Sequence, residues 1–396
     1  MSMLLDSVKA ANERWFRITP SNLLYDRTLF WLFISLMTLG FIIITSASVA
    51  EGSRLYDDPF HFALRDLVYI VLACLTAYIF VFVPVEKWEK WSPYLLLFAL
   101  LLLMLVLVPG IGRTVNGARR WIPLVLFNFQ PAEFVKFALI CYLSSYFVRR
   151  YEEVRHKQLS VVKPTLVLIL ISAFLLLQPD LGSSVVLGFI VFMMLFMVGA
   201  KIFQFIALAV AGFFAIYLLI LSSEYRLKRI TSYTDPFADP FGSGFQLSNS
   251  LIAFGRGEFW GTGLGNSIQK LEYLPEAHTD FIMAVVGEEF GLIGIISVIV
   301  LFTLLLIRIL KIGKESLLLE QRFGGYFAFG VVAWFFFQGA FNLGMTMGIL
   351  PTKGFTFPFV SYGGSSLIIN ALVIAILLRI DHENRLMRGH AHLRDD

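Results

Sequence analysis

The chain has 396 residues, of which 58% are apolar or aromatic and only 15% are charged. Soluble globular domains carry about 45–50% apolar and about 25% charged residues, so this composition excludes a water-soluble fold and is typical of a membrane protein. The formal charge of +4 comes from 32 basic and 28 acidic residues scattered along the chain. That distribution argues against a nucleic-acid partner.

Ten long apolar runs with few or no charges predict ten transmembrane helices. We therefore expect an all-α polytopic membrane protein, a bundle of about ten helices with one long extracytoplasmic loop between helices 7 and 8. The expected parts are a cytoplasmic N-terminal segment (1–28), a membrane domain (29–380, with the long loop at 222–280) and a cytoplasmic C-terminal tail (381–396). The predicted spans are 29–49, 67–85, 91–109, 131–148, 164–179, 181–200, 202–221, 281–307, 323–349 and 365–379.

The distribution of basic residues predicts the orientation of the bundle. An even number of crossings puts both termini on one side, and the segments on that side carry 20 lysines and arginines against 11 on the other. Because cytoplasmic loops are enriched in Lys and Arg, both termini are expected to be cytoplasmic. The loops 50–66, 110–130, 222–280 and 350–364 are then expected to face outward. Loop 222–280 is the longest connection, which makes it the first place to look for a functional site.

A glycine-rich run at 255–265 lies inside this loop. The run lacks the Gly-Lys-Ser/Thr ending of a phosphate loop and the spacing of a dinucleotide fingerprint. We therefore interpret it as tight turns and close backbone packing. In the following span, Gly287 and Gly291 have the small-xxx-small spacing that predicts a close helix contact.

Glu133 and Lys136 open the fourth span three residues apart, close enough to pair on one helix face. An isolated charge inside a bilayer costs about 2.5–3.5 kcal/mol even on the insertion scale, so such residues normally face a bundle interior or a wet cavity. We expect the pair to shape the polar part of a functional cavity. The alternatives are a buried structural pair and a pair that snorkels to the membrane surface.

Two aspartates precede predicted helices on the outward side. For Asp180, helix capping is at least as good an interpretation as catalysis. Asp280 closes the long loop, and a cap is the alternative there as well. Its neighbours favour a functional site, because a titratable His278 comes two residues earlier and Glu288 lies two turns into the span, on a helix face that can share a cavity with Asp280.

A second outward polar loop, 350–364, contains Lys353 as its single cation. Proline, glycine and hydroxyl residues flank this lysine, which favours a phosphate contact. The alternative is a solvated anchor at the membrane interface.

Six short motifs follow one another along the membrane region: VNGARRWI (115–122), QPAEFVK (130–136), QPDLGS (178–183), EAHTDFI (276–282), GEE (287–289) and SYGGSS (361–366). In this order they resemble the shape, elongation, division and sporulation family of bacterial membrane glycosyltransferases. The resemblance covers nearly the whole membrane region, and so many motifs in the right order are highly specific. Two further segments, 269–278 and 350–354, favour the branch of the family that acts in cell division.

The resemblance implies polymerisation of lipid II, the undecaprenyl-diphosphate-linked disaccharide pentapeptide, into glycan strands. The reaction is expected at the outer face of the bacterial inner membrane, at the division septum. The family's catalytic carboxylate falls on Asp280, which suits a base that takes a proton from the attacking 4-hydroxyl. Diphosphate is already a good leaving group and needs charge stabilisation, which is expected from Arg120, Lys353 or a bound divalent cation. The other expected substrate contacts are Glu133, Lys136, His278, Glu288, Ser361 and Ser365.

The residues and the resemblance also predict cofactors and partners. No cofactor is certain, and a divalent cation, magnesium or manganese, is the one candidate. Glu276, His278 and Asp280 carry suitable ligand atoms, although their spacing is not a strong metal signature. The expected partners are a class B penicillin-binding protein transpeptidase, whose single membrane helix docks on the bundle, other septal division proteins and the surrounding membrane lipids.

Two other functions stay open at this point, a lipid II flippase and a non-catalytic scaffold of the division machinery. Intramembrane charges suit a flippase as well as an enzyme. A transporter is expected to expose polar groups to each side in turn, whereas the candidate residues cluster at the outer ends of the spans. This clustering favours the enzyme.

Overall fold

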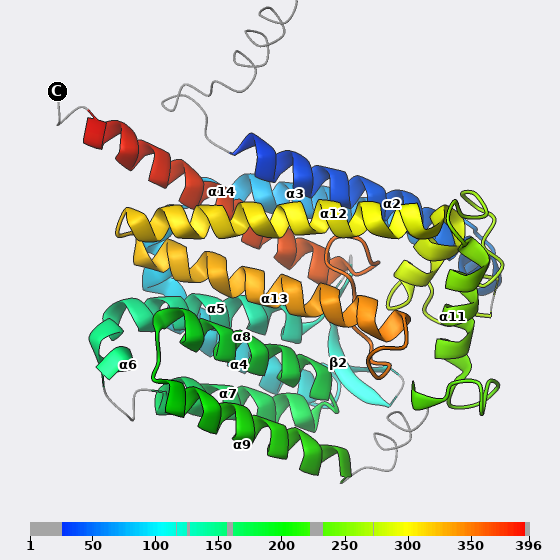
Figure 1. The fold of residues 1–396 in the computed structure, drawn as a ribbon, viewed down its shortest axis with the longest axis horizontal. Coiled ribbons are helices and arrows are strands. Elements are labelled where there is room, and N and C mark those ends of the chain that lie inside the picture. The colour runs from blue at the N-terminus through cyan, green and yellow to red at the C-terminus, as the bar shows by residue number, and fades with distance from the viewer. Residues whose placement is uncertain are drawn as a thin grey trace, which may run out of the picture.

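The computed structural model describes residues 26–115, 117–124, 127–156, 161–221, 233–271 and 273–392. Within these ranges nine helices are long and apolar enough to cross a membrane, and a tenth, α7 (Val162–Leu177), is apolar but shorter. They lie at the ten predicted spans, which confirms the multi-pass helical bundle (Figure 1). The nine are α2 (Arg27–Tyr56), α3 (His61–Phe80), α4 (Val85–Leu107), α5 (Pro131–Arg149), α8 (Leu181–Val198), α9 (Ile202–Leu221), α12 (Ile282–Leu318), α13 (Arg322–Thr346) and α14 (Gly364–His392).

Helices α5, α13 and α14 form the centre of the bundle. The buried share of the most apolar stretch is 83% in α5 and 78% in α14, but only 6% in α9. Helix α9 lies at the edge beside α8 and exposes large apolar side chains such as Phe203 and Phe213 (Figure 1). Lipid tails are as apolar as these side chains, so the exposed apolar perimeter is the surface that faces the membrane.

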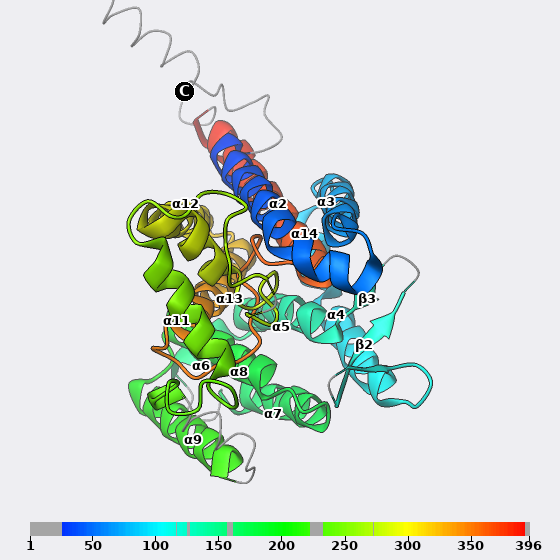
Figure 2. The ribbon, with the colours of Figure 1, turned by 90° about the vertical axis from the view of Figure 1, so that its right-hand side faces the viewer.

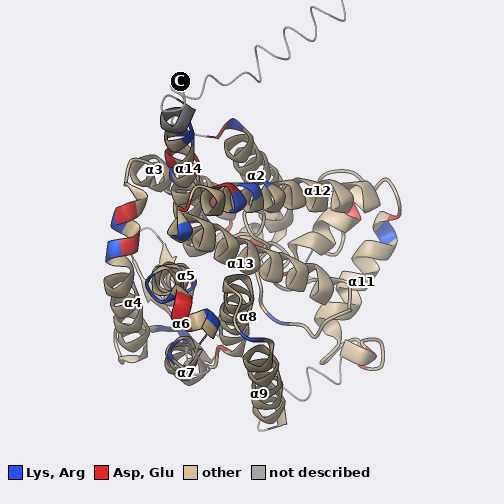
Figure 3. Cartoon of the chain, turned by 60° about the vertical axis from the view of Figure 1, so that its left-hand side comes forward, with Lys and Arg blue, Asp and Glu red and all other residues tan. Residues whose placement is uncertain are grey.

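The polar connections gather at one end of the bundle, which we call the loop end. It carries the described residues of 108–130, 178–180, 233–281 and 347–363, among them helix α11 (Phe245–Gly257) (Figure 2). The first of these connections holds a small antiparallel sheet of β1 (Arg113–Val115), β2 (Ala118–Pro123) and β3 (Asn128–Phe129), which the sequence analysis did not predict. In Figure 3 the helices show few charged residues along their lengths, whereas the short helix α6 (Tyr151–His156) at the opposite end is charged.

At that opposite end, which we call the terminus end, ion pairs join α2, α12 and α14. Asp26 accepts hydrogen bonds from Arg308 (2.7 Å) and Arg385 (2.8 Å), and both arginines also contact Asp381. The two aspartates are nearly fully buried. Helix α14 continues to His392, so most of the predicted tail at 381–396 is helical and its first residue takes part in this network.

Helix α12 is interrupted at Gly291, whose backbone is not helical (φ 64°, ψ −161°). Around the break the helix bonds to the glycine-rich run instead of to itself. The amide of Thr262 donates to the carbonyl of Glu288 (2.9 Å), and the amide of Leu292 donates to the carbonyl of Glu258 (3.0 Å). A membrane helix can be broken where other protein groups satisfy its backbone. The predicted close packing of this run is therefore confirmed.

Helix α11 also packs on α12 through glycine. A Cβ atom on Gly257 would lie 1.8 Å from the carbonyl oxygen of Gly287, which leaves no room for a side chain. The predicted close contact at Gly287 is confirmed, whereas Gly291 serves the helix break. Because the long loop meets α12 at both glycines, the start of α12 and the loop form one packed unit.

Candidate functional site

The extended segment 353–356 lies where several parts of the bundle meet. The side chain of Lys353 passes over Gly182 at the start of α8, because a Cβ atom on Gly182 would lie 2.6 Å from Cε of the lysine. The next residue, Gly354, lies against Asp280, since a Cβ atom on this glycine would be 2.7 Å from Oδ2 of the aspartate. Asp280 and Lys353, which the sequence predicted as site residues in two distant loops, are therefore neighbours.

Two amide side chains of α13 hold this segment. Gln338 donates through Nε2 to the carbonyl (2.9 Å) and the hydroxyl (3.0 Å) of Thr356. One turn later, Asn342 donates through Nδ2 to the carbonyl of Phe355 and to the backbone carbonyl of Asp280 (2.8 Å). Both amides are buried. Helix α13 thus fixes the 353–356 segment and the backbone of Asp280 at the same place.

Glu133 and Lys136 form a buried ion pair at the start of α5. Their side chains are 9% and 4% exposed, and Nζ lies 2.7 Å from Oε1. The ammonium group also donates to Oε1 of Gln338 (3.0 Å) and lies 4.8 Å from the ring centre of Trp334. Burial of both charges excludes the snorkelling alternative. The pair is connected through Gln338 to the 353–356 segment.

Arg120 projects from β2 to the turn between α7 and α8. Its guanidinium donates to two backbone carbonyls at 178–179. Asp180 caps α8 by accepting from the amide (3.2 Å) and the hydroxyl (2.6 Å) of Ser183, which confirms the capping interpretation. Arg120 and Lys353 therefore both lie at the N-terminus of α8. This is the end of a helix that favours a bound anion.

Asp280 does not cap α12. The helix begins at Ile282, its cap position is Phe281, and that residue makes no side-chain capping bond. Asp280 lies one residue further out and is partly exposed. The capping alternative for Asp280 is therefore not supported by the structure.

His278 packs against α2 and α3 at the loop end. Its Nδ1 lies 3.2 Å from Oε2 of Glu51, and its ring lies 4.7 Å from that of Phe62. Its carbonyl accepts from the amide of Tyr362 (3.0 Å). Burial raises the pKa of the Tyr362 phenol above its ordinary value, so this side chain stays neutral. These contacts tie the end of the long loop to the first two helices.

The contact of His278 with Glu51 decides whether this histidine can bind the candidate divalent cation. Within the residues that the structure describes, no three His, Cys, Asp or Glu side chains are grouped as metal ligands. Glu276 accepts from the hydroxyl of Thr279, and His278 faces Glu51. The arrangement does not fit a metal at Glu276, His278 and Asp280, and we derive no chemical step through one.

Glu288 is fully buried and binds the long loop. Its carboxylate accepts from the hydroxyl of Ser267 (2.5 Å) and from the backbone amides of Ile268 (3.0 Å) and Gln269 (3.2 Å). Arg256 of α11 lies 3.3 Å away. These contacts anchor the loop, and substrate binding by Glu288 stays a prediction.

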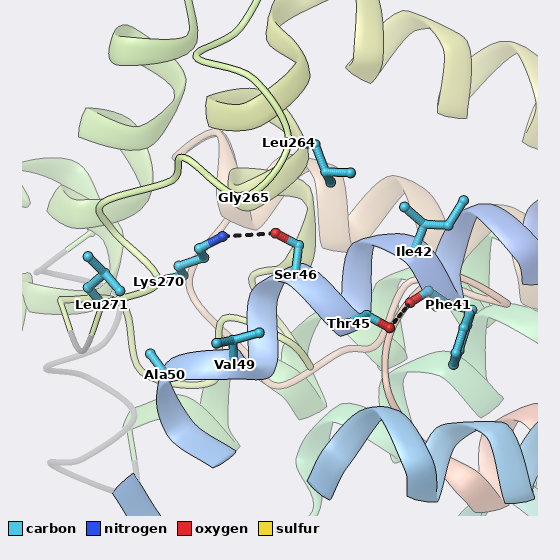
Figure 4. A pocket seen from close by; sticks show the side chains of 10 residues that line it. All are labelled: Phe41, Ile42, Thr45, Ser46, Val49, Ala50, Leu264, Gly265, Lys270 and Leu271. Atoms are coloured by element: carbon cyan, nitrogen blue, oxygen red, sulfur yellow. Dashed lines mark hydrogen bonds between the residues drawn. The ribbon is translucent and has the colours of Figure 1, made fainter. Parts of the chain in front are cut away.

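The adjacent Glu289 forms a second buried ion pair, which the sequence analysis did not predict. Lys270 donates to Glu289 (2.6 Å) and to the hydroxyl of Ser46 in α2 (2.8 Å), and Ser46 in turn donates to Glu289 (2.7 Å). The lysine lines a groove of about 540 Å³ between α2 and residues 264–271 (Figure 4). The pair therefore fastens the long loop to α2 as well as to α12.

The two predicted serines bind the backbone. Ser361 accepts from the amide of Phe357 (2.7 Å), which closes the turn before α14. Ser365 accepts from the amide of Gln130 (2.9 Å) and donates to the carbonyl of Asn128 (2.8 Å). Both contacts hold structure around the site, and substrate binding by these serines stays a prediction.

Gln338 and Asn342 were not among the predicted site residues, although the sequence contains a signal for them. Together with Thr346 they recur every four residues in an otherwise apolar span. This spacing places polar groups on one helix face. A polar face on a membrane helix indicates partners inside the protein, because lipid offers none.

We expect single neutral substitutions of the buried pair to be worse than the double substitution. Glu133→Gln or Lys136→Met strands one buried charge and should lower the free energy of unfolding by up to about 3–5 kcal/mol, whereas the double variant removes both charges. Thermal melting in detergent measures the difference. The matched control is Lys90→Met. Lys90 forms an exposed pair with Glu86, so its substitution should leave the melting temperature unchanged. Wild-type melting of both single variants would contradict the buried pairing.

Known proteins match the chain over nearly its full length. The family model FTSW_RODA_SPOVE, described as a cell cycle protein, matches residues 27–386. A protein of Pasteurella multocida (strain Pm70), called probable peptidoglycan glycosyltransferase FtsW, is 63% identical over 99% of both chains. A protein of the same name from Escherichia coli O6:H1 is 50% identical and covers 95% of this chain and 90% of its own.

Solved structures share the bundle. One is described as "Structural coordination of polymerization and crosslinking by a peptidoglycan synthase complex" and matches with a TM-score of 0.72 and 29% identity, over 91% of this chain and 98% of its own. The rod shape determining protein RodA of Thermus thermophilus matches with a TM-score of 0.67 and 29% identity, over 91% and 97% of the two chains. The resemblance that the motifs indicated is thereby confirmed, and the chain belongs to the FtsW, RodA and SpoVE family of cell cycle proteins.

Proposed function

We propose that the protein is a peptidoglycan glycosyltransferase that polymerises lipid II at the outer face of the cytoplasmic membrane during septal wall synthesis. The observation that carries this proposal is the contact of the Asp280 carboxylate with Gly354, next to Lys353. It brings a carboxylate and a cation together at the loop end of a membrane bundle. The name of the two relatives, probable peptidoglycan glycosyltransferase, supports the same activity.

In the proposed reaction Asp280 takes the proton from the 4-hydroxyl of the acceptor sugar. The oxygen of that hydroxyl forms a bond to the anomeric carbon of the donor. The bond between this carbon and the diphosphate oxygen breaks, and the diphosphate leaves with the electron pair. One carboxylate suffices, because a diphosphate leaving group needs no protonation, whereas glycosidases use two carboxyl groups.

Arg120 and Lys353 are suited to stabilise the charge that develops on the diphosphate. Both lie at the N-terminus of α8, where backbone amides and the helix dipole add to their positive charge. Glu133 and Lys136 lie further into the bundle, and Lys136 donates to Gln338. We call these three side chains the polar floor of the site. The base therefore lies against Gly354, and the cations lie at the start of α8.

The proposal includes partners and a location. One structural neighbour is described as a complex that coordinates polymerization and crosslinking, which supports a class B penicillin-binding protein transpeptidase as the partner here. Septal location and other division proteins as partners follow from the cell-division branch that the motifs favour. The excess of basic residues at the terminus end supports cytoplasmic termini.

The orientation predicts which positions react with thiol reagents that do not cross the membrane. In a Cys74→Ala background, which removes the exposed native cysteine, cysteines replacing Arg54 and Ser243 should be labelled in intact spheroplasts. Cysteines replacing His156 and Lys314 should be labelled only after lysis. The reverse pattern would put the loop end in the cytoplasm and remove the proposed site from the outer face.

Asp280→Asn tests the base directly. The substitution keeps the size of the side chain and removes the basic carboxylate, so glycan polymerisation by the purified protein with its transpeptidase should fall about 10²–10⁴-fold. Melting temperature and transpeptidase binding should stay at the wild-type level. Asp239→Asn is the matched control. Asp239 is an exposed aspartate of the same loop, and its carboxylate accepts from the amide of Ser243. Robust polymerisation by Asp280→Asn would exclude the base, and a wild type without polymerase activity would favour the flippase.

Lys353→Ala should weaken lipid II binding about 10- to 100-fold, the effect of losing one charged hydrogen bond. Lys353→Arg should keep part of the affinity because the positive charge remains. Binding of labelled lipid II to the protein in nanodiscs measures the effect, with Lys314→Ala at the terminus end as the control. Equal affinity of wild type and Lys353→Ala would return Lys353 to the role of an interfacial anchor.

A further inference from the structure

We propose that Asn342 is a positioning residue that sets the distance between the base and the cations of the site. The inference rests on the proposed function, because it assigns Asn342 a part in that reaction. Asn342 lies in α13 and is fully buried. It acts through the two segments to which it is bonded.

Its hydrogen bonds join residues that are far apart in the chain. The side-chain amide has two N–H groups, and Nδ2 contacts two backbone carbonyls, those of Asp280 (2.8 Å) and Phe355. One carbonyl belongs to the residue that carries the base. The other follows Gly354 and Lys353 directly, so one amide group fixes the backbone beneath both functional side chains.

The close contacts of Gly354 and Lys353 leave the 353–356 segment little room to shift. Gly354 lies so close to Asp280 that a single added methyl group would collide with Oδ2 at 2.7 Å. Lys353 is equally close to Gly182 of α8. A shift of the 353–356 segment by a fraction of that distance therefore changes where the carboxylate and the ammonium group lie.

The state of the side-chain oxygen, Oδ1, indicates that the role of Asn342 lies in the hydrogen bonds that its Nδ2 donates. In the part of the chain that the structure describes, Oδ1 of Asn342 is buried without a hydrogen-bond partner. A buried polar atom without a partner is destabilising. Packing alone would favour an apolar side chain of similar size, which carries no such atom, so the two donated bonds are what the amide contributes.

The neighbouring Gln338 does not replace it. Gln338 binds Thr356, one residue further along, and its oxygen accepts from Lys136 (3.0 Å) and Trp334 (2.8 Å). It links the segment to the rest of the polar floor but makes no contact with Asp280 among its hydrogen bonds. Asn342 is thus the described side chain of α13 that bonds to both sides of the site.

The test compares Asn342→Leu with Asn384→Leu. Leucine keeps the approximate size of asparagine and removes the donors. Asn384 is the matched control, because it is equally buried, donates one bond to Ser316 (2.8 Å) and lies at the terminus end of α14. Asn342→Ala and Asn384→Ala repeat the comparison with a smaller side chain if a leucine variant fails to insert.

Three measurements are made on the full-length protein with its transpeptidase and lipid II. In Asn342→Leu, kcat should fall about 10²-fold, the cost of a misplaced catalytic group, with a smaller change in KM. Deuterium uptake of residues 351–357 should rise, and it should not rise in Asn384→Leu. The effects of Asn342→Leu and Lys353→Ala on kcat should be non-additive, because both act on the same segment.

The outcomes separate this inference from the proposed function. Wild-type kcat in folded Asn342→Leu and Asn342→Ala would overturn the inference, and so would unchanged deuterium uptake at 351–357. Equal loss in the Asn342 and Asn384 variants, with additive effects of Lys353→Ala, would reduce Asn342 to a general stability role. A wild type that does not polymerise lipid II would refute the proposed function, while deuterium uptake would still decide whether Asn342 holds the segment.

Discussion

The pairing of polar groups inside an apolar bundle is the constraint on which the site depends. Lipid offers no hydrogen bonds, so a charge or an amide at membrane depth must find its partner in another part of the chain. Lys136 of α5 meets Gln338 of α13, and Gln338 meets Thr356. Each pairing fixes the distance between two distant segments. The polar groups therefore determine where the loops at one end of the bundle lie.

The same constraint holds the chain before and after Asp280. After Asp280, the buried carboxylates of Glu288 and Glu289 bind residues 267–270, and the loop backbone fills the break at Gly291. Before it, His278 contacts Glu51 of α2. A residue between two such attachments has little freedom to move. Fixed charges are what electrostatic stabilisation of a transition state requires, because no reorganisation is then paid during the reaction.

Local patterns predicted much of the fold, but the tertiary partners of the site residues were beyond them. Hydropathy located the ten spans, and sequence spacing located the Glu133–Lys136 pair, because both depend on residues close together in the chain. Helix geometry predicted that Glu288 could share a cavity with Asp280, yet the hydrogen-bond partners of its carboxylate come from the loop. The contact of His278 with Glu51 joins separate helices, which periodicity cannot reveal. Two of the three strands at 113–129 were missed because they have only three and two residues, too few to show an alternating pattern.

The arrangement of helices explains why loops can carry the chemistry here. Arg120 and Lys353 lie at the start of α8, and Asp280, the proposed base, lies before the start of α12. Helix α13 packs against both α8 and α12 (Figure 1). If α8 and α12 shifted relative to each other, base and cations would separate, whereas a rigid helix packed between them keeps the spacing. The loops then supply the side chains of the proposed site, and the accuracy of their placement comes from helix packing and from the two amides that face them.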